Sequence, residues 1–173
     1  MSKSRFDLYD KVYTLLCDVT PRREDCGKHC GARCCHSGSF SEHSTGMLLF
    51  PGEEAYLLAH GVNASRFTEA ADGTLLVCDG HCDRTLRPLA CRMFPYYPHI
   101  EPDGSVRILH DLRALSVCPL LTKRSLRRAP VRFLRSMKRA AHYLQSDPQI
   151  AAELQKNSDF LSSLTNLWDT LYT

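Results

Sequence analysis

Nine cysteines are the residues of this chain whose type and spacing could do chemistry, because clustered thiols can bind metal. Eight of them form two groups, the first of which places four thiols within ten residues. The two groups are Cys26, Cys30, Cys34 and Cys35, followed by Cys78, Cys82, Cys91 and Cys118. Thiolates hold both structural zinc and iron–sulfur clusters. We therefore expect these eight cysteines to be the ligands of a metal or iron–sulfur centre.

The expected compartment favours metal binding over disulfide formation. Residues 1–10 contain no apolar segment of the secretory kind, and the chain has no run of about 18 apolar residues that could cross a membrane. These features predict a cytoplasmic protein with no membrane partner. Disulfides rarely persist in a reducing cytosol, and an odd cysteine count with adjacent Cys34 and Cys35 does not suit a paired framework.

The spacing leaves the number and the identity of the metals open. Two four-thiolate centres would use all eight cysteines, and the adjacent Cys34 and Cys35 could then serve different centres. A single centre would use four and leave the others to redox or supporting roles. Zinc sites commonly contain cysteine pairs separated by two residues, which are absent here, whereas iron–sulfur clusters accept varied spacing. The pattern slightly favours a [4Fe-4S] cluster over Zn²⁺.

Polar residues beside the thiols are interpreted as supporting groups. His29, His36 and His81 could replace a thiolate ligand, but we expect them to be loop residues or hydrogen-bond donors to the ligands. Asp79 and Asp83 are expected to play the same supporting part. Arg92 is the candidate cofactor-binding residue, because a guanidinium near thiolates offsets their negative charge and could hold an anionic substrate. No catalytic residue can be assigned from the sequence.

The elements that must position these residues are predicted to form one domain over residues 1–173. The chain is long enough to bury a core without metal, and its 22 basic and 19 acidic residues make it only mildly basic. Apolar residues between Phe6 and Leu16 follow a helical pattern that should end before Pro21. Cys17 lies at the end of this helix, apart from both groups, and we expect it to be a small core residue.

The middle of the chain is predicted to combine short elements with irregular backbone. Residues 51–61 have the proline, acids and final glycine of a short helix, and residues 62–73 are expected to be a connector. Residues 74–77 are predicted to form a strand that places Cys78 at its end. A Pro-Asp-Gly turn predicts a hairpin over residues 99–110.

The last quarter of the chain is predicted to be helical. Apolar residues recur every three or four positions over residues 130–146, and Asp147 and Pro148 have the residue types of a helix start. The expected fold class is therefore α+β. A small, irregular, cysteine-rich metal-binding core with a short β-hairpin would occupy residues 21–122, between an N-terminal helix in residues 1–20 and a helical region in residues 123–173.

Three motifs together carry a resemblance to a known family. They are the clustered cysteines from Cys26 to Cys35, the stretch Arg87-Pro88-Leu-Ala-Cys91-Arg92-Met-Phe-Pro95, and the closing Cys118-Pro119. Over residues 26–119 the chain resembles the cysteine-cluster family of zinc- or iron-chelating proteins, often described as iron–sulfur cluster proteins and related to flagellin lysine methylase. Each of the eight cysteines has a counterpart there. The resemblance implies metal binding, with electron transfer or protein modification as the accompanying role.

Two other functions are weighed against this one. A structural zinc module would present a surface to a protein partner instead of carrying out chemistry. The stretch of residues 123–139 contains eight basic residues and no acid, which could contact nucleic acid, but an amphipathic helix with a solvated basic face explains it more simply. The sequence thus favours a metal centre with a possible protein partner or substrate, and does not favour nucleic-acid binding.

Overall fold

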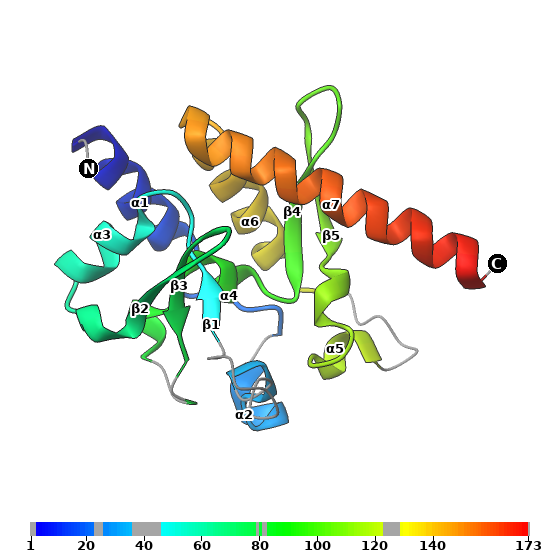
Figure 1. The fold of residues 1–173 in the computed structure, drawn as a ribbon, viewed down its shortest axis with the longest axis horizontal. Helices are drawn as coiled ribbons and strands as arrows, with labels where there is room; N and C mark the ends of the chain where they lie inside the picture. Colours follow the sequence, from blue (N-terminus) through cyan, green and yellow to red (C-terminus); the bar gives the residue numbers. More distant parts are fainter. Residues whose placement is uncertain are drawn as a thin grey trace.

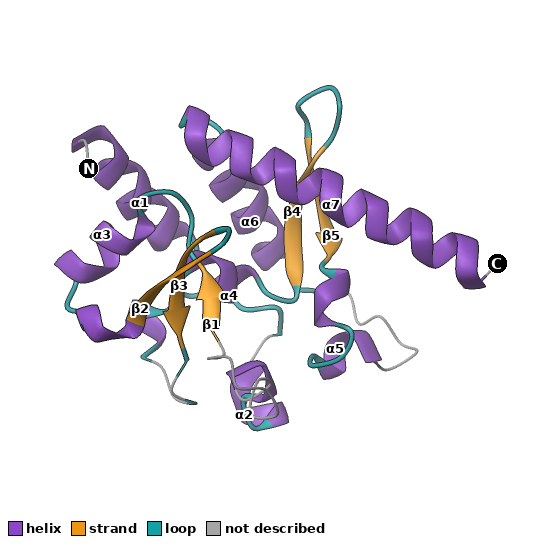
Figure 2. Cartoon of the chain, viewed as in Figure 1, coloured by secondary structure: helices purple, strands orange, loops and turns teal. Residues whose placement is uncertain are grey.

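The computed structural model describes residues 3–22, 26–35, 46–78, 80, 83–122 and 129–172. Within these residues the chain is a mixture of helices and small antiparallel sheets, which confirms the predicted α+β class (Figures 1 and 2). The α-helices are α1 (Lys3–Leu15), α2 (Cys26–Cys30), α3 (Glu53–Ala59), α4 (Leu89–Met93), α5 (Pro119–Thr122), α6 (Val131–Leu144) and α7 (Pro148–Tyr172). Single-turn 3-10 helices are η1 (Arg33–Cys35), η2 (Ala64–Arg66), η3 (Arg84–Leu86) and η4 (Leu112–Ala114).

The first sheet contains three antiparallel strands in the order β1-β3-β2. Its strands are β1 (Gly46–Leu48), β2 (Phe67–Ala70) and β3 (Gly73–Val77). A Cβ atom at Gly46 would lie 2.5 Å from the carbonyl oxygen of Leu76, so only glycine fits where β1 begins against β3. The predicted strand at residues 74–77 is confirmed. The predicted connector is wrong in its second half, because β2 pairs with β3 across the tight turn at residues 71–72.

The second sheet is a two-stranded hairpin of β4 (Tyr96–Ile100) and β5 (Val106–His110). Tyr96 pairs with His110 and Ile100 pairs with Val106, so the turn contains the predicted Pro-Asp-Gly sequence. The predicted hairpin is therefore confirmed, and it begins three residues earlier than expected. Helix α7 packs against β4 and α6 packs against both strands, which covers the hairpin with helices (Figure 1).

Long helices at both ends of the chain contribute a large part of the main core. α1 buries Leu8, Tyr9, Val12 and Tyr13 and packs against α6 and α3. The predicted start of α7 is confirmed, because the Asp147 carboxylate accepts hydrogen bonds from the backbone N–H groups of Gln149 and Ile150, at 3.0 and 3.2 Å. The carboxylate of Asp147 also pairs with Arg5 of α1, so this cap connects the two ends of the chain.

A smaller apolar cluster lies apart from the main core. It consists of Ala114, Cys118 and Leu121, and Phe94 and Leu120 are among the half-buried residues packed against it. The region expected to be irregular, residues 21–122, thus contains both sheets and most of the short helices. Regular elements, rather than free loops, therefore position the described cysteines of this region.

Candidate metal centre

The first two cysteines of the N-terminal group lie on one helical turn. Cys26 begins α2 and Cys30 ends it, so their spacing of four residues places both side chains on the same side of the helix. The Sγ atom of Cys30 lies 3.7 Å from the carbonyl oxygen of Cys26, to which it can donate a weak hydrogen bond. The spacing of these two thiols is therefore helical, whereas the sequence suggested a loop.

A sharp turn brings the other two cysteines of this group back toward the same region. Gly31 and Ala32 both have positive φ angles, 60° and 52°, which reverses the chain directly after α2. The amide of Cys35 then donates a 2.8 Å hydrogen bond to the carbonyl of Ala32, and Cys34 and Cys35 lie on η1. Glycine at position 31 adopts this conformation without a side-chain clash.

Three later cysteines are presented by three different elements. Cys78 directly follows strand β3, and Cys91 lies on α4. Cys118 directly precedes α5, and two backbone hydrogen bonds fix its position. Its amide donates to the carbonyl of Ala114, and its carbonyl accepts from the amide of Leu121. The strand end and the short helices are rigid supports for these side chains.

The cysteines from these separate segments line one cavity of about 130 Å³. Seven of the eight expected ligands contribute to its wall, namely Cys26, Cys30, Cys34, Cys35, Cys78, Cys91 and Cys118. The eighth, Cys82, lies outside the described residues, as do His36, Asp79 and His81. In Figure 1 the elements around this cavity, α2, α4, α5 and the ends of β1 and β3, lie together in the lower half of the molecule.

The cysteine side chains in this cavity do not form a closed coordination shell. Among the described residues, no group of three or more His, Cys, Asp or Glu side chains is arranged to hold a metal ion. The cavity therefore gathers the expected donor atoms along its wall, and metal coordination by them stays a prediction. His29 is exposed and does not line the cavity, whereas Asp83 does.

The thiols in the cavity influence one another's protonation. A hydrogen bond with Cys35 lowers the pKa of the Cys34 thiol, although burial and the neighbouring Cys91, Cys30 and Cys26 raise it in part. The cavity thus brings thiols of both sequence groups within electrostatic reach of one another. Burial raises the pKa of the Cys118 thiol on the other side of the cavity, and nearby Cys30 adds to this effect.

Arg92 lies in the cavity wall, but its guanidinium is directed mainly at the backbone. Its Nε donates to the carbonyl of Arg87 at 2.7 Å, and its Nη2 donates to those of Arg84 and Thr85 at 3.0 and 2.8 Å. Its Nη1 reaches the carbonyl of Leu16 at 3.5 Å. The side chain is 8% exposed. Arg92 therefore fastens the segment before α4 to Leu16, directly after α1.

The buried carboxylate of Glu53 was not singled out by sequence reasoning. It is fully buried and accepts hydrogen bonds from the Tyr13 hydroxyl at 2.6 Å, the Leu89 amide at 2.7 Å and the Phe50 amide at 3.0 Å. Burial raises the pKa of Glu53, and these hydrogen bonds, together with the charge of Arg92, lower it in part. Glu53 thereby joins α1, α3 and the start of α4. The only sequence signal was a pair of acids at a helix start.

Cys17 differs from its expectation as a small core residue. The side chain is exposed and lines the cysteine cavity at its border with a second, larger cavity. The chain leaves α1 after Leu15, so Cys17 falls beyond the part of the helix that packs into the core. Its helical register therefore no longer predicts burial.

Comparisons with protein families, with curated proteins and with solved structures find no match for this chain. None of the helices in the described part of the chain combines the length and the hydropathy that crossing a lipid bilayer requires. The geometry of the cavity and the sequence motifs are thus the basis for a functional proposal.

Proposed function

We propose that this chain is a cytoplasmic metal-binding protein that holds an iron–sulfur cluster or zinc through its clustered cysteines. The observation that carries the proposal is the cavity into which seven cysteines from distant parts of the sequence converge. The likeness of its motifs to the cysteine-cluster family supports the same function. Such convergence is expected of metal ligands, because cysteines that serve only to fill the core need not share one cavity wall.

The chemistry of the donor set fits a soft metal. Thiolate ligands select zinc, copper(I) and iron–sulfur clusters over hard cations such as magnesium. Cys26, Cys30 and Cys34 from the first group and Cys91 from the second group lie within electrostatic reach of one another. A set of this kind can supply the four thiolates that either a zinc ion or a [4Fe-4S] cluster takes. Cys35, Cys78, Cys82 and Cys118 would complete a second centre or support the first.

The bound metal would supply the chemistry, and the residues of the cavity wall would position it and surround it. Bound iron–sulfur would supply one-electron chemistry, and bound zinc would supply structural crosslinking or Lewis acidity. Arg92 lines the cavity wall, where its guanidinium holds the backbone that precedes α4 in place. Apolar residues, including Leu16, Leu76 and Val117, also line this wall and limit the access of water.

The decisive experiment is a metal and acid-labile sulfide analysis of protein purified without oxygen, combined with an absorbance spectrum. Iron with sulfide and absorbance near 400 nm would establish a cluster and favour electron transfer or assistance to a protein modification reaction. Colourless protein with stoichiometric zinc and no sulfide would favour a structural module that presents a surface to a protein partner. Protein that binds neither metal after anaerobic reconstitution would overturn the proposal.

The basic segment does not add a nucleic-acid function to this proposal. Residues 123–128 lie outside the described part of the chain. The remainder enters α6, which buries Phe133 and Met137 and exposes Arg135 and Lys138. This is the two-faced pattern of an ordinary amphipathic surface helix.

A further inference from the structure

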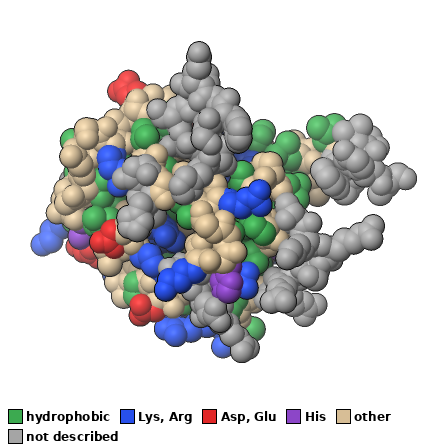
Figure 3. Space-filling model, turned by 90° about the horizontal axis from the view of Figure 1, so that it is seen from below, with side chains coloured by type: hydrophobic (Ala, Val, Ile, Leu, Met, Phe, Trp, Pro, Cys, Tyr) green, Lys and Arg blue, Asp and Glu red, His purple; other side chains and the backbone are tan. Residues whose placement is uncertain are grey.

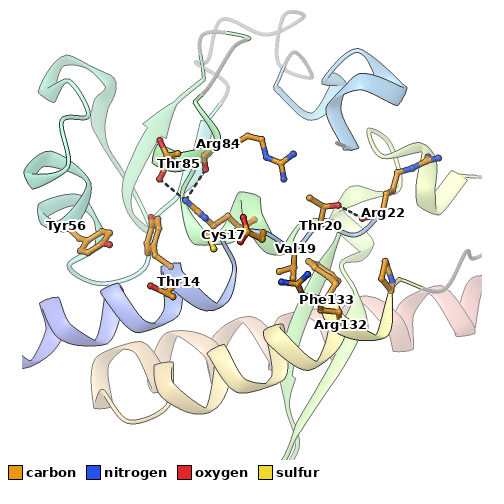
Figure 4. A pocket seen from close by; sticks show the side chains of 14 residues that line it. Thr14, Cys17, Val19, Thr20, Arg22, Tyr56, Arg84, Thr85, Arg132 and Phe133 are labelled. Carbon is orange, nitrogen blue, oxygen red and sulfur yellow. Dashed lines mark hydrogen bonds between the residues drawn. The ribbon is translucent and has the colours of Figure 1, made fainter. Parts of the chain in front are cut away.

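A second cavity lies beside the cysteine cavity and is much larger. Its volume of about 890 Å³ falls within the range of roughly 300–1,000 Å³ that is usual for small-molecule sites. It opens between the end of α1, the 3-10 helix η3 and the start of α6 (Figure 4). None of the seven expected metal ligands that the structure describes lines it.

The walls of this cavity combine aromatic surface with positive charge. Tyr13, Tyr56 and Phe133 supply ring surface, and the hydroxyls of both tyrosines are already hydrogen-bonded, to Glu53 and Asp10. Among the described residues, the lining also contains four arginines, Arg22, Arg84, Arg92 and Arg132, and one carboxylate, that of Asp18. A concave site with this excess of one sign attracts ligands of the opposite charge.

Two of these arginines have no ion-pair partner in the part of the chain that the structure describes. Within the described residues, neither Arg22 nor Arg132 makes an ion pair. Arg132 enters the cavity from α6, while the segment of Arg84 and Thr85 lies across from it (Figure 4). Figure 3 shows several Lys and Arg side chains near the middle of the face seen from below. Guanidinium groups bind carboxylates and phosphates well, because their donors match the geometry of these anions.

We propose that this cavity binds a small organic anion, a carboxylate or phosphate attached to an apolar or aromatic body. The anionic group would lie against Arg132 and Arg84, and the body would lie against the apolar part of the cavity wall. Arg92, expected from the sequence to hold an anionic substrate, gives most of its donors to backbone carbonyls. In this proposal Arg132 and Arg84 hold the anionic group instead.

The position of the cavity places such a ligand next to the cysteines. Five residues line both cavities, namely Cys17, Val19, Thr20, Arg84 and Arg92. A ligand in the larger cavity would therefore touch the wall that separates it from the thiols. The anion site stands on its own observations, and its test does not require knowledge of the metal.

The test uses two fluorescent probes that differ by one charge. 8-Anilinonaphthalene-1-sulfonate carries a sulfonate, and N-phenyl-1-naphthylamine has the same rings without it. The full-length protein, as purified, is titrated with each probe. We expect saturable binding of one sulfonate probe per chain and clearly weaker binding of the neutral probe. Equal affinity for both probes would overturn the proposal, because the arginines would then contribute nothing.

Arginine variants locate the binding site. Arg132→Gln and Arg84→Gln should each raise the Kd of the sulfonate probe by roughly tenfold, the size expected for one charge-assisted hydrogen bond. Arg135→Gln is the matched control, because Arg135 lies on the same helix, is exposed and lines neither cavity. Arg132 is exposed, so its replacement should leave the fold intact. An unchanged Kd in both cavity variants, or an equal loss in the control, would refute the site.

Competition identifies the anionic group. 1-Naphthyl phosphate and 1-naphthoate are each titrated against the bound sulfonate probe. Displacement by either one supports the organic-anion site, and the one that acts at the lower concentration indicates whether phosphate or carboxylate is preferred. Failure of both to displace the probe would contradict the proposal.

Discussion

Cys91 and Arg92 are neighbours on α4, and their side chains act on different parts of the molecule. Cys91 lines the cysteine cavity, while Arg92 donates to backbone carbonyls before α4 and stacks on the Tyr13 ring, with 4.5 Å between its guanidinium carbon and the ring centroid. The types and spacing of the cysteines predicted seven of the residues that line this cavity, but they did not predict Cys17, which also lines it. The partners of Arg92 could not be predicted in this way, because a backbone carbonyl leaves no signature in the sequence.

Replacement of Cys91 tests its part in metal binding. Cys91→Ser should weaken metal affinity by at least about tenfold, since even the hydrogen-bond partners of metal ligands contribute that much. Cys17→Ser is the matched control, because Cys17 borders the same cavity and is not among the expected ligands. Metal content per chain after anaerobic reconstitution is the measurement. Full metal content in Cys91→Ser would remove this residue from the ligand set.

Replacement of Glu53 tests the network behind the cavity. Glu53→Gln leaves one oxygen acceptor where two now serve three buried donors, and it removes the charge that faces Arg92. The expected loss is about 2–4 kcal/mol in the free energy of unfolding.

The neighbouring Glu54→Gln is the matched control for this variant. Glu54 accepts a hydrogen bond from the Thr74 hydroxyl and is only half-buried, and glutamine can still accept that bond. Its effect should stay within about 0.5 kcal/mol. Urea unfolding of both variants gives the comparison, and similar small losses in the two would show that the buried network contributes little.

At the scale of single elements, the helices were the most predictable part of the fold. Their apolar periodicity and end signals indicated α1, α3, α6 and the start of α7 close to their observed bounds. Strand β2 was missed because three of its four residues are exposed and carry no alternating pattern, so their pairing with β3 decides their conformation. Helix α2 was missed because its glycine and cysteines are poor helix formers.

The cap of α7 makes a prediction about pH dependence. Burial would raise the pKa of Asp147, but the hydrogen bonds from Arg5 and from the amides of Ile150 and Gln149 outweigh it and hold the pKa below its usual range. The folded state thus binds the Asp147 proton less readily than the unfolded state. Its contribution to stability is therefore complete well above the ordinary pKa of 3.8 and is lost as pH falls through that value toward the folded one.

Asp147→Asn and Asp147→Ala separate the charge from the cap. Asparagine caps helices as well as aspartate does, so Asp147→Asn should lose mainly the ion pair with Arg5. The free energy of unfolding should fall by about 1 kcal/mol at neutral pH. Asp147→Ala should lose about a further 1 kcal/mol for the cap. Urea unfolding measures the difference in the free energy of unfolding between the original protein and Asp147→Asn. This difference should become smaller as pH falls below about 4. A difference that stays constant with pH would show that the carboxylate charge does not contribute to stability.

At the scale of the whole molecule, the cysteine cavity is assembled from segments that are far apart in the sequence. Cys26 and Cys118 are separated in the sequence by both sheets, yet both line the same cavity. One sequence could indicate that these residues share a ligand, but it could not give their relative positions. Those positions depend on long-range packing, such as α1 against α6 and α7 against β4.

The same arrangement predicts that metal should stabilise the whole fold. A metal bound in the cavity would join α2, η1, the end of β3, α4 and the start of α5, and a ligand that binds only the folded state stabilises it by mass action. At free metal about 100 times its Kd this amounts to about 2.7 kcal/mol, or about 5–10 °C in Tm for a chain of 173 residues. Calorimetry before and after chelation gives the shift, with Cys91→Ser as the control that should show less of it. An equal shift in that variant would place the stabilising metal elsewhere, because a site without this thiolate could not account for it.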